Sequence, residues 1–276
     1  MQINFTKMHG LGNDFVVVDA TTQAIPLSQE IIAKLANRNL GIGFDQLLMV
    51  EPSPVAECDF RYRIFNSDGS EVEQCGNGAR CFARFVVDSG LSHKTAIPVL
   101  TAGGRIILNL QANGDVTVDM GAPELDPAKV PLVATDQSIT YQHTIMGRQV
   151  TFSAISMGNP HAVITVDDID TAEIETIGKA FQSDPIFPKQ VNVGFMQVLN
   201  RHTIRLRVYE RGVGETMACG TGACAAIVAG HLQGLLDDTV TVILPAGNLQ
   251  INWAGDNGIV KMTGPATTVY HGTITV

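Results

Sequence analysis

The chain has 276 residues, of which 45% are hydrophobic and 16% charged, and its formal net charge is −9. This composition is typical of a compact globular protein rather than a disordered one. A negative chain offers no electrostatic footprint for nucleic acid or an anionic membrane, so we expect neither as a partner.

The N-terminal residues carry no long apolar segment of the kind that marks a signal peptide. No apolar run approaches the ~18 residues that a membrane-spanning helix needs. The five cysteines are an odd number without secretory context, which favours free thiols in a reducing compartment. We therefore expect a cytoplasmic protein.

The first half predicts short strands around one strong helix. Apolar runs bounded by turn residues indicate strands at 15–18, 44–50, 61–66, 104–110 and 116–120. Ser28 is the expected N-cap of a helix over 30–37. A second helix is expected over 78–88, directly after a Cys-Gly-Asn-Gly segment, with Gly90 as its C′ residue.

The second half repeats the first at a spacing of 144 residues. Cys75 recurs as Cys219, and each is followed by Gly-x-Gly and a helical run. Other positions with this spacing are Arg61/Arg205, Arg63/Arg207, Glu71/Glu215, Gly78/Gly222, Gly90/Gly234 and Ala102/Ala246. Further upstream, 12–14 resembles 158–160 and 43–46 resembles 194–197 at larger offsets, which insertions in loops would explain.

This pattern predicts an internal duplication and an α+β fold. We expect two pseudo-symmetric domains, each a curved, mainly antiparallel sheet around a central helix, joined by a proline-containing linker at 121–131. The helix over 223–232 is apolar nearly all round, so we expect it to be buried. A cleft at the pseudo-two-fold axis would bring the two cysteine motifs together.

The cysteine motifs place a thiol beside the first turn of a helix. Unpaired N–H groups and the helix dipole favour negative charge there, and a thiol pKa of about 8.5 can fall to roughly 3.5–7.5. We expect Cys75 and Cys219 to be functional. Cys58, Cys81 and Cys224 lack this context, and we expect them to be buried structural residues.

Three chemistries remain open for the two thiols. A zinc site is disfavoured because Cys75-x5-Cys81 and Cys219-x4-Cys224 are wider than the usual C-x2–4-C spacing. A redox pair would require the two Cα atoms to lie within about 7 Å. The third is acid/base catalysis, in which a thiolate removes a proton from one face of a carbon and a thiol supplies one to the other.

Acid/base chemistry requires stabilisation of a carbanion. No lysine lies in a motif that resembles a Schiff-base site, so we expect no pyridoxal cofactor, and the wide cysteine spacing leads us to expect no metal. A helix dipole contributes only about 0.3–1 kcal/mol. Directed oxyanion donors contribute roughly 2.7–4 kcal/mol each by deletion. The backbone N–H groups at 76–77 and 220–221 are the candidate donors, since glycine allows close approach.

At this point the motifs resemble a known family. Asn66-x-Asp68-Gly69-Ser70-x4-Cys75-Gly76-Asn77-Gly78-x-Arg80 is similar to the signature of the diaminopimelate epimerase family. The segments 8–15, 158–161, 209–212, 215–216 and 218–220 resemble that family too, in the same order along nearly the whole chain.

The resemblance implies a pyridoxal-independent isomerase that interconverts LL- and meso-diaminopimelate, in lysine and peptidoglycan precursor synthesis. Cys75 and Cys219 would be the catalytic pair, and His161 and Glu210 would tune the thiols. The implied substrate contacts are Asn13, Gln46, Asn66, Gly76, Asn77, Asn159, Asn192, Glu210, Arg211, Gly220 and Thr221.

The resemblance also implies an architecture. Two β-barrel domains are expected, residues 1–119 with 265–276 and residues 120–264, with the active site in the cleft between them. A homodimer is expected, with Tyr270 implicated in its formation.

Two alternatives stay open beside this one. A proline or hydroxyproline racemase of the same fold would leave Arg211 and the asparagines unexplained, because those substrates lack a second amino-acid group. A non-enzymatic thiol sensor would need no polar recognition residues.

Overall fold

A computed structural model describes residues 2–22, 25, 27–72, 76–256 and 258–276. The chain divides into two compact units, Met1–Asp119 with Thr263–Val276, and Met120–Met262. In the described part of the chain, no helix is long and apolar enough to cross a membrane.

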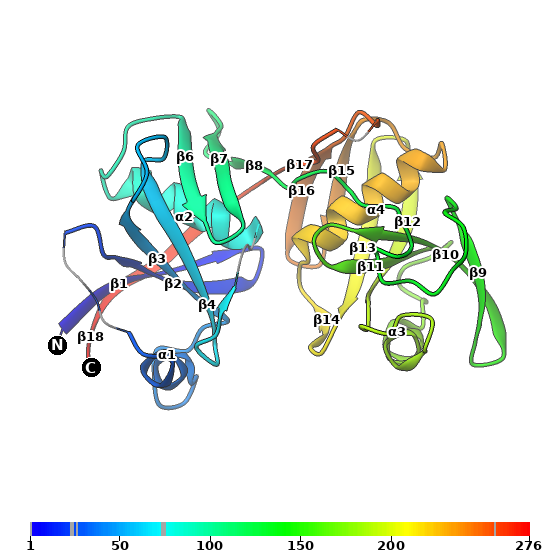
Figure 1. Ribbon diagram of the computed structural model, residues 1–276, viewed down its shortest axis with the longest axis horizontal. Coiled ribbons are helices and arrows are strands. Elements are labelled where there is room, and N and C mark those ends of the chain that lie inside the picture. Colours follow the sequence, from blue (N-terminus) through cyan, green and yellow to red (C-terminus); the bar gives the residue numbers. More distant parts are fainter. Residues whose placement is uncertain (1, 23–24, 26, 73–75, 257) are drawn as a thin grey trace. The chain divides into compact units, whose positions relative to one another are not determined.

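The first unit combines strands from both ends of the chain with two helices (Figure 1). Its elements are β1 (Gln2–Gly10), β2 (Asn13–Asp19), α1 (Gln29–Ala36), β3 (Gln46–Pro52), β4 (Phe60–Asn66), β5 (Glu71–Val72), α2 (Gly76–Asp88), β6 (Ala96–Thr101), β7 (Gly104–Leu110), β8 (Val116–Asp119) and β18 (Thr267–Thr275).

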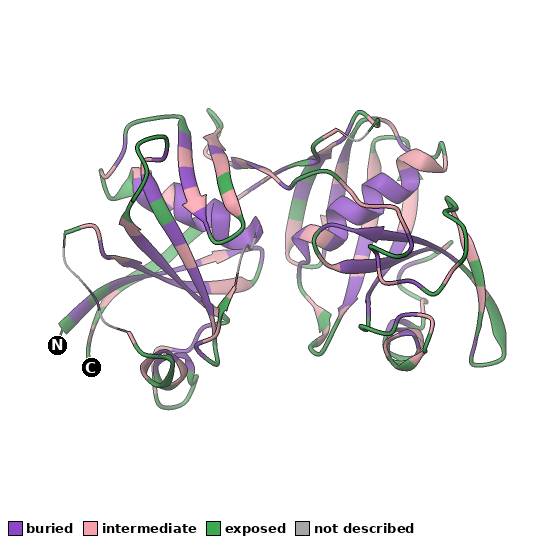
Figure 2. Ribbon diagram, in the orientation of Figure 1, coloured by how far each residue is buried: buried purple, intermediate pink, exposed green. Residues whose placement is uncertain are grey.

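The central helix of the first unit is α2. It packs against β1, β2, β3, β7 and β8, and all its residues from Gly76 to Ala83 are buried (Figure 2). The shorter helix α1 lies on the other side of the sheet and buries one face. Ser28 caps α1 by accepting a hydrogen bond from the backbone N–H of Ile31, as the sequence predicted.

The second unit contains β9 (Tyr141–Ile145), β10 (Arg148–Ser156), β11 (Pro160–Thr165), α3 (Ile174–Ser183), β12 (Asn192–Asn200), β13 (Thr203–Glu210), β14 (Gly214–Thr216), α4 (Gly220–Leu232), β15 (Thr239–Leu244) and β16 (Gly247–Asn252). Strand β17 (Lys261–Gly264) then returns the chain to the first unit. Helix α4 is buried from Gly222 to Gly230 among β10, β11, β12, β13 and β16, which explains its lack of a polar face.

The two units share one topology. The parallel pair β2–β3 corresponds to β11–β12, and the parallel pair β4–β6 corresponds to β13–β15. The antiparallel pairs β3–β4, β4–β5 and β6–β7 correspond to β12–β13, β13–β14 and β15–β16. In both units the central helix follows the short hairpin strand. The predicted α+β fold with an internal duplication is confirmed.

Some elements differ from the sequence prediction. Strands β1 and β6 and helix α3 had no predicted counterpart. The segment 121–131 is not an open linker: Glu124 pairs with Ser156 through backbone hydrogen bonds of 2.9 Å in both directions, and Val130 is buried. The prolines keep this segment out of regular helix and strand, but it still packs within the second unit, against β10.

Candidate active site

Cys219 lies at the start of the buried helix α4. It is the N-cap residue in an extended conformation, and only 4% of it is exposed. The second glycine of the motif, Gly222, leaves room for the thiol, because a Cβ there would lie 3.2 Å from the Cys219 Sγ. In the first unit, a Cβ at Gly78 would lie 2.5 Å from the Tyr62 hydroxyl. Glycine therefore lets each helix start pack closely. Cys75, the other predicted catalytic residue, lies outside the described residues.

The surroundings of Cys219 keep it protonated. Burial raises the pKa of the thiol well above its ordinary value, and the negative charge of Glu210 raises it further. Hydrogen bonds from Thr221 and from the backbone of Gly222 oppose this rise but do not cancel it. The pKa of Cys219 does not fall as a thiol at a helix start can, because desolvation outweighs both the Gly222 hydrogen bond and a dipole worth about 0.3–1 kcal/mol.

A chain of hydrogen bonds connects Cys219 to a buried histidine. The thiol lies 3.7 Å from the Thr221 Oγ1, and the Asn159 Nδ2 donates to that oxygen at 3.3 Å. The Asn159 Oδ1 lies 3.0 Å from the His161 Nε2. Burial and the nearby Arg211 lower the pKa of His161 to about 3, so the ring is neutral at pH 7. His161 therefore reaches the thiol through two intermediate side chains.

The ends of β12 and β13 position the remaining predicted residues of the second unit. The Asn192 Nδ2 donates to the backbone oxygen of Pro160 at 3.0 Å, and its Oδ1 accepts from the backbone N–H of Arg211 at 2.9 Å. The guanidinium of Arg211 donates to the backbone oxygen of Lys189 at 3.0 Å. Asn192 thus fixes the loop that carries Arg211.

In the first unit, the predicted polar residues bond to one another. The Asn13 Oδ1 accepts from the Asn77 Nδ2 at 3.3 Å, in the first turn of α2. The Gln46 Nε2 donates to the Asn66 Oδ1 at 3.0 Å, and the Asn66 Nδ2 donates to the Ser70 hydroxyl at 3.1 Å. Strand ends and a helix start therefore collect these amides in one place.

The sequence analysis missed the charged residues that support Asn13. The Asn13 Nδ2 donates to the Asp45 Oδ2 at 3.0 Å, and Arg38 bridges Asp45 and Asp14 at 2.8 and 2.7 Å. Lys7 also bonds to Asp14. Burial would raise the pKa of Asp14, but Arg38 and Lys7 hold it well below its usual range. Lys7, a lone charge in an apolar run, was the available sequence signal.

Strand register corrects one part of the predicted duplication. Gln46 lies opposite Phe15 in the parallel pair β2–β3, and Asn192 lies opposite His161 in β11–β12. Phe15 and His161 each follow the asparagine of a Gly-Asn motif by two residues. The counterpart of Gln46 is therefore Asn192 rather than Gln197, because the ladder, not local sequence similarity, sets which residues are equivalent.

The predicted site residues consequently form equivalent pairs, namely Asn13/Asn159, Gln46/Asn192, Asn66/Glu210, Cys75/Cys219, Gly76/Gly220 and Asn77/Thr221. Two of the pairs differ in chemistry. The amide of Asn66 corresponds to the carboxylate of Glu210, and the amide of Asn77 corresponds to the hydroxyl of Thr221. His161 and Arg211 have uncharged counterparts, Phe15 and Ser67.

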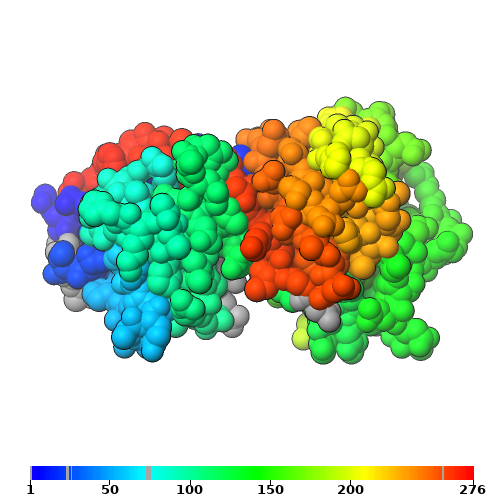
Figure 3. Space-filling model, turned by 90° about the horizontal axis from the view of Figure 1, so that it is seen from above, coloured from blue at the N-terminus to red at the C-terminus, as the bar shows by residue number. Residues whose placement is uncertain are grey.

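Other predicted features lie elsewhere. Cys58, Cys81 and Cys224 are buried and form no disulfide. Among the described residues, no group of three or more His, Cys, Asp or Glu side chains could hold a metal ion. Tyr270 is 44% exposed on β18, and its ring meets that of Phe5 at 6.0 Å. Figure 3 shows the C-terminal residues (red) along the surface of the first unit.

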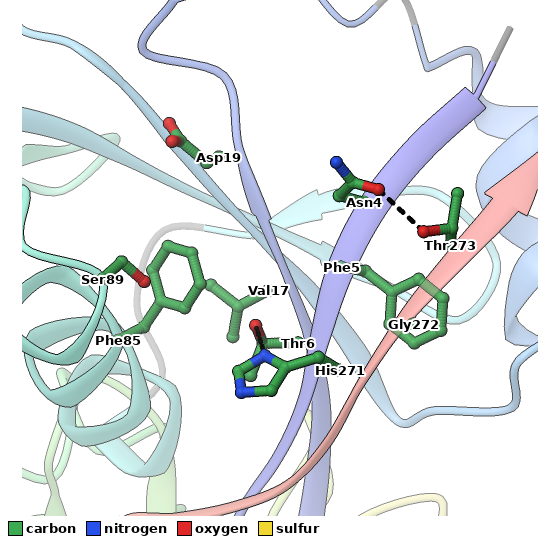
Figure 4. Close-up of a pocket in the computed structure, with 10 residues that line it drawn as sticks. All are labelled: Asn4, Phe5, Thr6, Val17, Asp19, Phe85, Ser89, His271, Gly272 and Thr273. Atoms are coloured by element: carbon green, nitrogen blue, oxygen red, sulfur yellow. Dashed lines mark hydrogen bonds between the residues drawn. The ribbon is translucent and has the colours of Figure 1, made fainter.

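A pocket of about 380 Å³ lies in the first unit, between β1, β2, β18 and the C-terminal end of α2 (Figure 4). His271 and Thr6 lie side by side in its lining, on the paired strands β18 and β1, with 3.0 Å between the His271 Nδ1 and the Thr6 Oγ1. None of the predicted catalytic or substrate-binding residues lines this pocket.

The profile of a protein family described as diaminopimelate epimerase matches residues 5–125 and 153–269. The chain belongs to the diaminopimelate epimerase family. It is 56% identical to a diaminopimelate epimerase from Nitrosomonas europaea, over 99% of both chains. It is 57% identical to one from Thioalkalivibrio sulfidiphilus, over 100% of both chains.

Solved structures share the fold at low sequence identity. A phenazine biosynthesis protein of the PhzF family from Bacillus anthracis matches with a TM-score of 0.73 and 17% identity, over 100% of both chains. A hydroxyproline epimerase from Agrobacterium vitis matches with a TM-score of 0.71 and 16% identity, over 99% of this chain and 92% of the other. These two proteins are described by different functions, so the shared fold alone does not show which reaction this chain catalyses.

Proposed function

We propose that this enzyme interconverts LL- and meso-2,6-diaminopimelate by two-base proton transfer at Cα, with Cys75 and Cys219 as the catalytic pair. Family membership supports the substrate. The observation that supports the mechanism is the position of Cys219, buried at the N-cap of α4, where desolvation raises the pKa of the thiol and suits it to donate a proton.

The proposed step moves two protons and changes no oxidation state. The Cys75 thiolate takes the proton as the Cα–H bond breaks, and the Cys219 S–H bond breaks as its proton goes to the opposite face of Cα. The configuration inverts, leaving a thiol at Cys75 and a thiolate at Cys219. The reverse reaction, or proton exchange with solvent, restores the starting state.

The polar residues would supply recognition and charge stabilisation. Backbone N–H groups at 76–77 and 220–221 would hold the substrate carboxylate that gains enolate character. Neutral amides from Asn13, Gln46, Asn66, Asn159 and Asn192 suit a substrate with two amines and two carboxylates. Arg211 would pair with the distant carboxylate and Glu210 with an ammonium group, while His161 and Glu210 tune the thiol.

The same proposal covers the biological setting. The reaction would supply meso-diaminopimelate for lysine and peptidoglycan precursor synthesis, without a cofactor. Reduced thiols require a reducing compartment, which supports a cytoplasmic location. The exposed Tyr270 on β18 would contribute to a homodimer.

Deuterium incorporation tests the reaction. LL-diaminopimelate incubated with the enzyme in D2O without added cofactor should gain deuterium at Cα as it inverts. Cys75→Ala and Cys219→Ala should each lose inversion, whereas Cys58→Ala should retain it. Wild-type turnover in either of the first two variants would contradict the two-base mechanism. If the enzyme inverts proline or hydroxyproline and not diaminopimelate, the proposed substrate is wrong.

A further inference from the structure

Thr216 contacts the carboxylate beside the catalytic thiol. It is the last residue of β14, and its hydroxyl donates to the Glu210 Oε1 at 2.5 Å. Glu210 ends the neighbouring strand β13, and Thr216 lies opposite Val208 in the antiparallel pair. A hydrogen bond to a charged acceptor is stronger than one between neutral groups, so this contact restrains the carboxylate.

The position of Glu210 matters because it acts on Cys219. Both the negative charge of Glu210 and a hydrogen bond between the two side chains favour the protonated thiol. The backbone of Glu210 is held separately, since the Gln182 Nε2 donates to its carbonyl oxygen at 2.9 Å. The strand therefore fixes the main chain, and Thr216 fixes the side chain.

The duplication provides a natural comparison. Val72 occupies the position of Thr216 in the first unit, opposite Ile64 in β4 as Thr216 is opposite Val208 in β13. Asn66 occupies the position of Glu210. The first unit therefore combines Val72 with the amide of Asn66, whereas the second combines Thr216 with the carboxylate of Glu210.

The hairpins themselves are held in the same way in both units. Arg63 binds Glu71 at 2.8 and 2.7 Å, and Arg207 binds Glu215 at 2.6 and 2.8 Å. Since the first hairpin forms with valine, folding of the second does not require the hydroxyl. The hydroxyl must serve the carboxylate.

We propose that Thr216 is a positioning residue that holds the Glu210 carboxylate against the Cys219 thiol and so makes the two half-sites chemically unequal. This inference rests on the proposed function for its catalytic meaning. Its structural content concerns only the state of one thiol, which can be measured without turnover.

Other ionisable groups near this region are His161, Arg211 and the Arg207–Glu215 pair. His161 on β11 lies at the end of the hydrogen-bond chain from Cys219 and is neutral because burial and Arg211 lower its pKa to about 3. The Arg207–Glu215 pair also bridges β13 and β14, but from the opposite face of the hairpin, because its two residues alternate with Val208 and Thr216. None of these groups bonds to the Thr216 hydroxyl, which donates to Glu210, so a change in the reactivity of the Cys219 thiol on replacing Thr216 should report on Glu210.

Alkylation rates test the proposal. Each variant is treated with iodoacetamide at intervals from pH 7 to pH 9, and labelling of Cys219 is followed by peptide mass spectrometry. Thr216→Val should raise the rate about tenfold at pH 8, because only the thiolate reacts and a displaced carboxylate disfavours the thiolate less. Thr216→Ser keeps the hydroxyl and should behave as wild type. Val72→Thr is the matched control and should change nothing.

A second background separates positioning from loosened packing. Glu210→Gln should raise the Cys219 rate as Thr216→Val does, and adding Thr216→Val to Glu210→Gln should have no further effect. An unchanged or lower rate in Thr216→Val would overturn the proposal, as would additive effects in the double variant. A failure of the wild type to invert diaminopimelate would overturn the proposed function alone.

Discussion

Protonation of His161 should destabilise the second unit in mild acid. The ring is 1% exposed, and its Nδ1 has no hydrogen-bond partner among the described residues. Burial, followed by the charge of Arg211, lowers its pKa from 6.5 to about 3. The folded state therefore binds a proton much less readily than the unfolded chain.

The sign and size of the effect follow from proton linkage. Between pH 6.5 and pH 3 the unfolded state binds more protons, so the free energy of unfolding falls as the pH falls. Each pH unit below 6.5 costs about 1.4 kcal/mol, which gives a loss of about 2 kcal/mol at pH 5 relative to pH 8. The lowered pKa of Asp14 affects stability only below its ordinary value of 3.8, outside the range from pH 8 to pH 5.

Urea unfolding at pH 8, 6 and 5 measures this loss. Trp253, the single tryptophan, is buried in the second unit, so its fluorescence reports on the unit that contains His161. His161→Gln removes the titration while keeping a side chain that can bond to Asn159. The difference in unfolding free energy between wild type and this variant should change by about 2 kcal/mol between pH 8 and pH 5. A difference that is independent of pH would refute the reasoning.

Two further perturbations test the first unit by thermal unfolding. Gly78→Ala places a Cβ 2.5 Å from the Tyr62 hydroxyl and should lower the free energy of unfolding by about 1–3 kcal/mol. The control is Gly194→Ala in the second unit, whose new Cβ would have its nearest contact at 3.5 Å and should be nearly neutral. Equal stability of the two variants would contradict the packing argument. Asp14→Ala leaves the largely buried Lys7 without its carboxylate and should cost about 3 kcal/mol. A melting temperature equal to that of wild type would show that the Lys7–Asp14 pair does not contribute.

The predictable part of this fold follows from local chemistry. The N-cap at Ser28 and the two central helices could be predicted because capping groups and apolar periodicity act within a few residues. Strand β1 was not predicted because its pairing partner β18 lies at the opposite end of the chain. The placement of the proline-containing segment 121–131 likewise depended on contacts with β10 that no local pattern records.

The sequence by itself determined that the chain is a duplication with paired cysteine motifs. Cys75 and Cys219 are separated by the same 144 residues as the other repeated positions, and this spacing can be read without a structure. The tertiary structure decided which residues are equivalent, since strand register pairs Gln46 with Asn192 although local similarity favoured Gln197. It also decided that the pKa of Cys219 is raised rather than lowered. Ionisation depends on burial and on the charge of Glu210, and both arise only when distant segments pack together.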